Sequence, residues 1–91
     1  MSKAASRRLV PILSLDVVGY SRMIEADESA AHALVRNVFS DRVEPSMAKA
    51  GGTIFKTMGD GLLAEFTSLV SAVDWAAQLQ QELFETPLKA P

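Results

Sequence analysis

The chain of 91 residues contains no cysteine, which excludes disulfide bonds and thiolate metal sites and fits a reducing compartment. It also lacks an excess of either charge, because nine Lys and Arg stand against eleven Asp and Glu, for a formal net charge of −2. A nucleic-acid-binding surface normally shows a basic stripe. We therefore expect no nucleic-acid partner.

Long hydrophobic runs are absent too, and crossing a bilayer needs roughly 20 apolar residues. Basic residues (Lys3, Arg7 and Arg8) precede an apolar stretch, as in a signal peptide. That stretch is broken by Pro11, runs into Asp16 and is followed by no small-residue cleavage site. The sequence predicts a cytoplasmic protein without a membrane span.

The composition that is present, 48% hydrophobic and 22% charged, is typical of a globular protein. The length fits a single domain over residues 1–91, with an ordered core expected at 7–85. Residues 9–18 are apolar on both faces apart from Ser14 and Asp16, which predicts a strand covered on both sides. A turn at Gly19 then leads into a short helix.

A longer helix is expected next, with Asp27 as its N-cap and Gly51 just past its end. Pro45 should kink or restart this helix. Two short strands at 53–58 and 62–66 form a β-hairpin around the turn 59–61. Thr67 or Ser68 caps the last helix. The apolar faces predicted for the two long helices comprise Ala31, Leu34, Val35, Val38, Val43 and Met47, and Leu69, Val73, Ala76, Leu83 and Phe84 with Val70 and Ala77 beside them.

The order strand–helix–helix–β-hairpin–helix predicts an α+β fold, an incomplete ferredoxin-like (split βαβ) layer that lacks its closing strand. No strand can form in residues 87–91, which contain two prolines. One edge of the first strand should therefore be unpaired, so that a partner can pair with it. We interpret Met23, Met47 and Met58 as core filling, Trp75 as a core or interface residue, and His32 as an exposed helix residue.

Two aspartates at strand ends are the strongest functional signal. Asp16 closes the first strand, and Asp60 lies in the hairpin turn between Gly59 and Gly61. Carboxylates are the ligands that Mg²⁺ prefers, and one or two of them suffice. Each aspartate alone is more often a turn or cap residue. Nearby features favour a phosphate ligand, because the turn at Gly19 can present backbone N–H groups.

The segment 16–21, Asp-Val-Val-Gly-Tyr-Ser, resembles the Asp-x-x-Gly-Phe-Thr/Ser stretch of class III adenylate and guanylate cyclases. The segment 55–66, Phe-Lys-Thr-Met-Gly-Asp-Gly-Leu-Leu-Ala-Glu-Phe, resembles their hairpin. The residues at 7–9, 25–27 and 51–52 fit bacterial members. The resemblance runs from about Arg7 to Glu85 and covers only the N-terminal half of such a catalytic domain.

This resemblance implies that Asp16 and Asp60, assisted by the backbone carbonyl of Val17, hold two Mg²⁺ or Mn²⁺ ions. The ribose 3′-hydroxyl of ATP would then attack the α-phosphorus, giving cyclic AMP and pyrophosphate. The turn of Gly19, Tyr20 and Ser21 would contact the phosphates.

Lys56 occupies the position that reads the base in this family, where lysine implies adenine and glutamate implies guanine. Lysine is a donor and suits the N1 acceptor of adenine, although a plain surface lysine is the alternative. The family's sites form between two subunits, which implies a homodimer.

The residues that stabilise the family's transition state lie beyond Pro91, so we expect the chain alone to be weakly active or inactive. Two alternatives stay open, a non-catalytic nucleotide or metal sensor and a dimerisation module.

Overall fold

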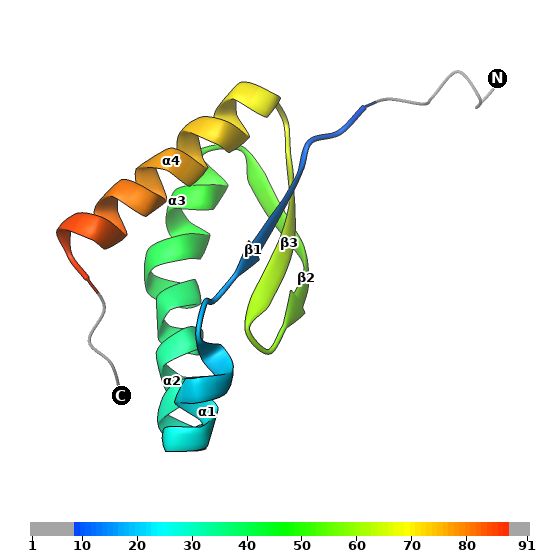
Figure 1. Ribbon diagram of the computed structural model, residues 1–91. Helices are drawn as coiled ribbons and strands as arrows, with labels where there is room; N and C mark the ends of the chain where they lie inside the picture. The colour runs from blue at the N-terminus through cyan, green and yellow to red at the C-terminus, as the bar shows by residue number, and fades with distance from the viewer. Residues whose placement is uncertain (1–8, 88–91) are drawn as a thin grey trace, which may run out of the picture.

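The computed structural model describes residues 9–87 and contains a three-stranded antiparallel sheet with helices on one of its faces (Figure 1). The elements in chain order are β1 Ile12–Asp16, α1 Tyr20–Ala26, α2 Glu28–Val38, the π-helical segment η2 Phe39–Val43, α3 Glu44–Lys49, β2 Gly52–Met58, β3 Gly61–Phe66 and α4 Leu69–Glu85. The predicted α+β class and order of elements are confirmed. Residues 7 and 8 of the predicted core lie outside the described residues.

The strands lie in the order β1-β3-β2, so β3 is the central strand and pairs antiparallel with both neighbours. Within residues 9–87, β1 pairs with β3 alone, as predicted, and its other edge carries no strand. In β2 the register shifts between Ile54 and Lys56, which marks a β-bulge.

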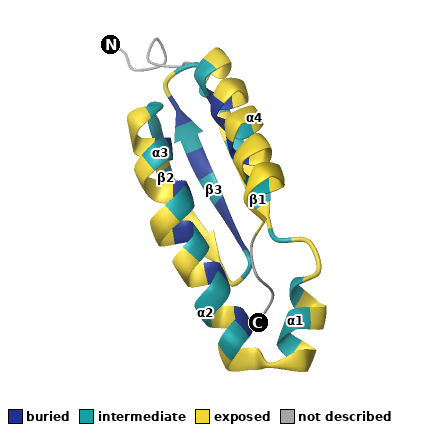
Figure 2. Cartoon of the chain, turned by 90° about the vertical axis from the view of Figure 1, so that its left-hand side faces the viewer, coloured by how far each residue is buried: buried dark blue, intermediate teal, exposed yellow. Residues whose placement is uncertain are grey.

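The core lies between the helices and the inner face of the sheet, where β3 is buried along its length (Figure 2). Trp75 of α4 is 4% exposed and packs on Phe66 of β3, with ring centroids 6.0 Å apart. Its indole Nε1–H donates to Ser46 Oγ of α3 at 2.8 Å, which satisfies the one polar group that a buried tryptophan carries. Trp75 therefore links α4 both to α3 and to the sheet, and its predicted core role is confirmed.

The long helical stretch from α2 to α3 buries every fourth residue, namely Ala31, Val35, Phe39, Val43 and Met47. In a regular α-helix a step of four residues overshoots a full turn by about 40°. Four such steps would carry Met47 roughly 160° away from Ala31. The π-helical turn η2 accommodates one additional residue and removes much of this drift.

This register corrects the predicted apolar face of that helix. Phe39 is buried although the sequence reading omitted it, whereas Leu34 and Val38 are only partly buried. Of the predicted kink or restart at Pro45, the structure shows a restart of the α-helix, because Pro45 lies in the first turn of α3, directly after η2.

The predicted buried face of α4 was wrong in part. The residues that α4 buries are Ala72, Trp75 and Leu79, with Ala76 and Leu83 partly buried against them. The residues that it exposes include Leu69, Val70, Val73 and Phe84. Helix α4 has two apolar faces, and the sheet covers the one that contains Trp75. Met58, predicted as core filling, is 42% exposed.

Among the helices of residues 9–87, none combines the length and apolar character that crossing a bilayer requires.

Replacement of Leu62 by alanine tests the central position of β3. Leu62 is 0% exposed, so Leu62→Ala should lower the free energy of unfolding by about 2–5 kcal/mol through lost burial and a cavity. Val73, 58% exposed on α4, is the control. Val73→Ala should change the free energy of unfolding by no more than about 0.5 kcal/mol. Equilibrium urea unfolding measures both. Equal losses would contradict the assignment of the core.

Candidate functional site

The two aspartates lie at the same end of the sheet. β1 ends at Asp16, which pairs with Gly61 at the start of β3. The next residue, Val17, donates its backbone N–H to the carbonyl oxygen of Asp60 at 2.8 Å. The end of β1 and the β2–β3 turn are thus joined by backbone hydrogen bonding, and residues far apart in the sequence become neighbours.

Gly61 leaves space for the side chain of Asp16. A Cβ atom on Gly61 would lie 2.5 Å from Asp16 Oδ1 and 2.7 Å from the carbonyl oxygen of Leu15. Neither contact is sterically possible without movement, so the carboxylate of Asp16 lies directly over a position that only glycine can occupy. Asp16 is exposed, on the sheet face opposite the helices. A ligand on that face can reach it.

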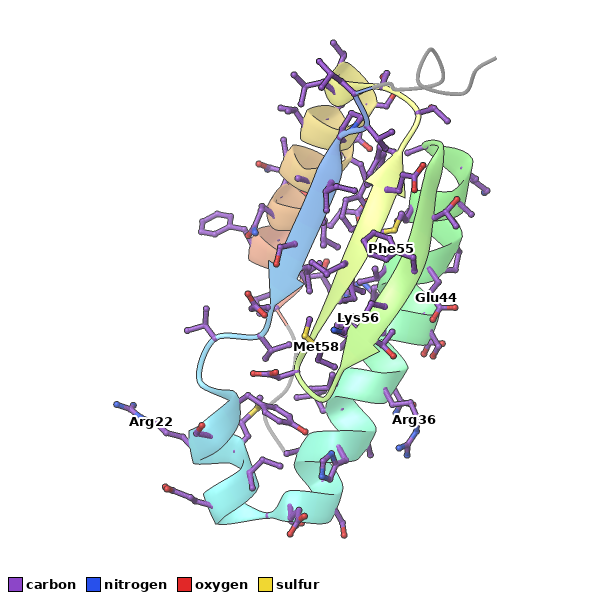
Figure 3. All side chains as sticks on the ribbon, turned by 90° about the vertical axis from the view of Figure 1, so that its right-hand side faces the viewer. Arg22, Arg36, Glu44, Phe55, Lys56 and Met58 are labelled. Atoms are coloured by element: carbon purple, nitrogen blue, oxygen red, sulfur yellow. The ribbon has the colours of Figure 1, made fainter. Side chains whose placement is uncertain are left out.

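Lys56 lies on the same open face, on the far strand. It follows the bulge in β2 and pairs with Leu63, two residues along β3 from the partner of Asp16. Strand spacings place the Cα atoms of Lys56 and Asp16 roughly 12 Å apart. Figure 3 shows Lys56 on this face with Phe55 and Met58, which are 53% and 42% exposed. Within residues 9–87, Lys56 forms no ion pair, so its ammonium group is available to a ligand.

The turn predicted to contact phosphate lies beside the hairpin turn. Gly19 has φ +80°, in the left-handed region that favours glycine, and immediately precedes α1. The ring and hydroxyl of Tyr20 each lie 3.9 Å from the point where a Cβ on Gly59 would be. Ser21 is exposed in the first turn of α1. Tyr20 therefore brings α1 against the turn that holds Asp60.

His32 is a residue of this region whose contacts the sequence reading missed. Its Nδ1 lies 2.8 Å from the hydroxyl oxygen of Tyr20, and the two rings meet edge to face with centroids 6.0 Å apart. Its side chain is 49% exposed, so the predicted exposure is confirmed. The signal available in the sequence was the hydroxyl group of Tyr20, which needs a partner when its ring is half-buried.

The candidate metal-ligand atoms at this end of the sheet are oxygens. Asp16 and Asp60 supply carboxylates, and Val17 supplies a backbone carbonyl. Across residues 9–87, no group of three or more Asp, Glu, His or Cys side chains could hold a metal ion. Mg²⁺ is usually bound through one or two carboxylates together with substrate phosphates, so a carboxylate pair fits this ion in kind and in number.

Comparison with known proteins gives one informative similarity. The chain is 47% identical over 77 residues, 85% of its length, to a protein of Rhizobium meliloti (strain 1021) named "Putative adenylate cyclase 3". The chain spans about 13% of the length of that relative. No family model matches the chain, and no solved structure matches it. The similarity supports an adenylate cyclase-like relationship.

Alanine at Gly61 should disturb the position of Asp16. The added Cβ would meet Asp16 Oδ1 and the Leu15 carbonyl, so we expect Gly61→Ala to cost about 1–3 kcal/mol of the free energy of unfolding. Gly59→Ala is the matched control, because its Cβ would make only ordinary contact with Tyr20 at 3.9 Å. Urea unfolding compares the two. A loss at Gly59 as large as that at Gly61 would refute the close approach of Asp16.

Proposed function

We propose that this chain forms the metal- and nucleotide-binding half of a class III nucleotidyl cyclase catalytic domain of the adenylate type. The observation that carries the proposal is the hydrogen bond from Val17 N–H to the Asp60 carbonyl, together with the pairing of Asp16 with Gly61. These contacts bring the two segments that resemble cyclase motifs to one end of the sheet. The 47% identity to a protein named as an adenylate cyclase agrees with this.

Asp16, Asp60 and the carbonyl of Val17 would hold two Mg²⁺ or Mn²⁺ ions. Bound there, the ions would favour deprotonation of the ribose 3′-hydroxyl and stabilise charge on the entering and leaving oxygens. The chain itself would hold the ligand oxygens in position before the metal ions and substrate bind. The backbone hydrogen bond of Val17 holds the two loops at one spacing, and Gly61 keeps the Asp16 carboxylate on the open face. Donors placed before the substrate binds need no reorganisation during the reaction.

Phosphate and base would be bound by separate segments of the chain, a turn and a strand. The turn of Gly19, Tyr20 and Ser21 lies beside the Asp60 turn and would contact the phosphates of ATP. Lys56 would donate to adenine N1, which is an acceptor. The exposed apolar neighbours of Lys56 on the sheet, Phe55 and Met58, would suit a flat base.

The active enzyme would be assembled from more than one such unit. We propose a ferredoxin-like layer in which a further strand pairs with the free edge of β1. Two hollows of about 270 Å³ each, both lined by Leu15, Asp16, Leu79 and Gln80, lie along that edge. A homodimer would cover the open face, where Ile12, Phe55 and Met58 are exposed. Metal ligands and Lys56 would then come from different subunits, so one chain alone would turn over weakly or not at all.

A dimerisation module without nucleotide chemistry is the second candidate. The same exposed apolar residues on the open face favour it, because apolar side chains gathered on one face mark interaction surfaces. Under this alternative, the aspartates would be turn residues.

Titration of the chain with Mn²⁺ and a non-cyclisable ATP analogue tests the proposed function. Calorimetry should show metal-dependent binding that weakens at least about tenfold in Asp16→Ala and in Asp60→Ala, because each variant removes a metal ligand. Asp74→Ala is the control, since Asp74 is an exposed carboxylate on α4, away from the site.

Absence of binding by the folded wild-type chain would refute the proposal and favour the dimerisation module. Binding that all three alanine variants retain would show that the nucleotide sits elsewhere.

Exchange of Lys56 for glutamate tests the assignment of the base. Lys56→Glu replaces a donor by an acceptor, so affinity for the ATP analogue should fall roughly tenfold while affinity for the matching GTP analogue falls less or rises. Lys49→Glu, at the end of α3 on the helical side, makes the same charge change and should affect both analogues alike. An equal loss for both analogues in Lys56→Glu would mean that Lys56 does not read the base.

A further inference from the structure

We propose that His32 is a positioning residue, which through Tyr20 holds the Gly19–Ser21 turn against the β2–β3 turn. The identity of the ligand that the two turns bind rests on the proposed function. The contacts themselves are hydrogen bonding and packing among residues of α1, α2 and the hairpin.

Helix α1 packs against α2 but lies at the margin of the core. It is seven residues long, contains no buried residue, and its N-cap makes no side-chain hydrogen bond. Isolated helices of this length are marginal in water, so their position depends on tertiary contacts. Tyr20 supplies such a contact, because its ring packs at the border of the core. The bond from Tyr20 to His32 then ties α1 to α2, which is fixed by the buried Ala31 and Val35.

The arrangement of His32 favours this bond. Its Nε2 lies 3.6 Å from Glu28 Oε2, one turn earlier on α2. With its proton on Nε2, the nitrogen on the side of the carboxylate, the imidazole presents Nδ1 as an acceptor to the Tyr20 O–H. Glu28, His32 and Tyr20 therefore lie in series, with a hydrogen bond between His32 and Tyr20 and a longer electrostatic contact between His32 and Glu28.

Tyr20 passes this restraint to the hairpin. Its ring and hydroxyl lie 3.9 Å from the point where a Cβ on Gly59, the residue before Asp60, would be, and the carbonyl of Asp60 accepts from Val17 at the end of β1. Figure 1 shows α1 and the β2–β3 turn at the same end of the molecule. These neighbours form a closed series of contacts that runs from Val17 through Asp60, Gly59 and Tyr20 back to Gly19. Loss of the His32 contact should make the position of Tyr20 relative to the β2–β3 turn less fixed.

Four single variants, and the double variant that combines Tyr20→Phe with His32→Ala, test the proposal. Tyr20→Phe removes only the hydroxyl, and His32→Ala removes its partner. His32→Asn is the conservative variant, because the asparagine amide can place an acceptor near the position of Nδ1. Arg36→Ala, an exposed residue one turn further along α2, is the control.

The first measurement needs no ligand. Amide NMR spectra should show shifted resonances for Gly59, Asp60 and Gly61 in Tyr20→Phe and His32→Ala, with the double variant no worse than either. His32→Asn should restore the wild-type positions, and Arg36→Ala should leave them unchanged. Shifts confined to α1 and α2 in both single variants would overturn the proposal. If His32→Ala fails to fold, Tyr20→Phe and His32→Asn still decide it.

The second measurement is affinity for Mn²⁺ with the non-cyclisable ATP analogue. Loss of one hydrogen bond should weaken binding roughly two- to tenfold in Tyr20→Phe and His32→Ala, non-additively, with recovery in His32→Asn. Unchanged affinity in both single variants, with a binding wild type, would overturn the proposal and leave the proposed function intact. Hairpin shifts as expected in a wild type that binds no nucleotide would support the positioning role and refute the proposed function.

Discussion

The antiparallel pairing of β1 with β3 determines where the candidate site lies. Leu13 and Leu15 of β1 face the core opposite Ala64 and Leu62, and a slip of one residue would turn every side chain of β1 to the other face. Such a slip would expose two leucines, so hydrophobic burial fixes the register. The same register places Asp16 on the open face opposite Gly61. Burial of Leu13 and Leu15 on one face of the sheet thus places the carboxylate of Asp16 on the other face.

The two faces of the sheet therefore have separate roles. The inner face is covered by the helices and carries the buried side chains of β3, whereas the outer face carries Asp16 and Lys56. The bulge in β2 reinforces this division. It sets Phe55 and Lys56 opposite a single residue of β3, so two successive side chains are both exposed where a regular strand would bury one. An irregularity of this kind re-aims side chains and leaves no pattern in the sequence.

Prediction from sequence succeeded where one local signal decides the outcome. Asp27 was expected as one N-cap and Thr67 or Ser68 as the other. In the structure Asp27 and Ser68 are the caps, and each accepts a hydrogen bond from the backbone N–H three residues on. It failed where tertiary packing chooses between equal alternatives. Helix α4 has two apolar faces, and nothing in its own sequence shows that the sheet covers the face of Trp75. The burial of Phe39 depends on a π-helical turn, which helical periodicity does not include.

The candidate site divides in the same way. The positions of Asp16 and Asp60 follow from strand ends, and strand ends follow from a core that composition and periodicity reveal. The position of Tyr20 depends instead on packing at the border of the core and on a side-chain hydrogen bond to His32 of α2, twelve residues away, with no period to mark it. A short helix without buried residues opens at low free energy compared with a central strand. The aspartates are therefore held by backbone pairing and hydrogen bonding at the end of the sheet, whereas the turn beside them lies at the margin of the core with α1.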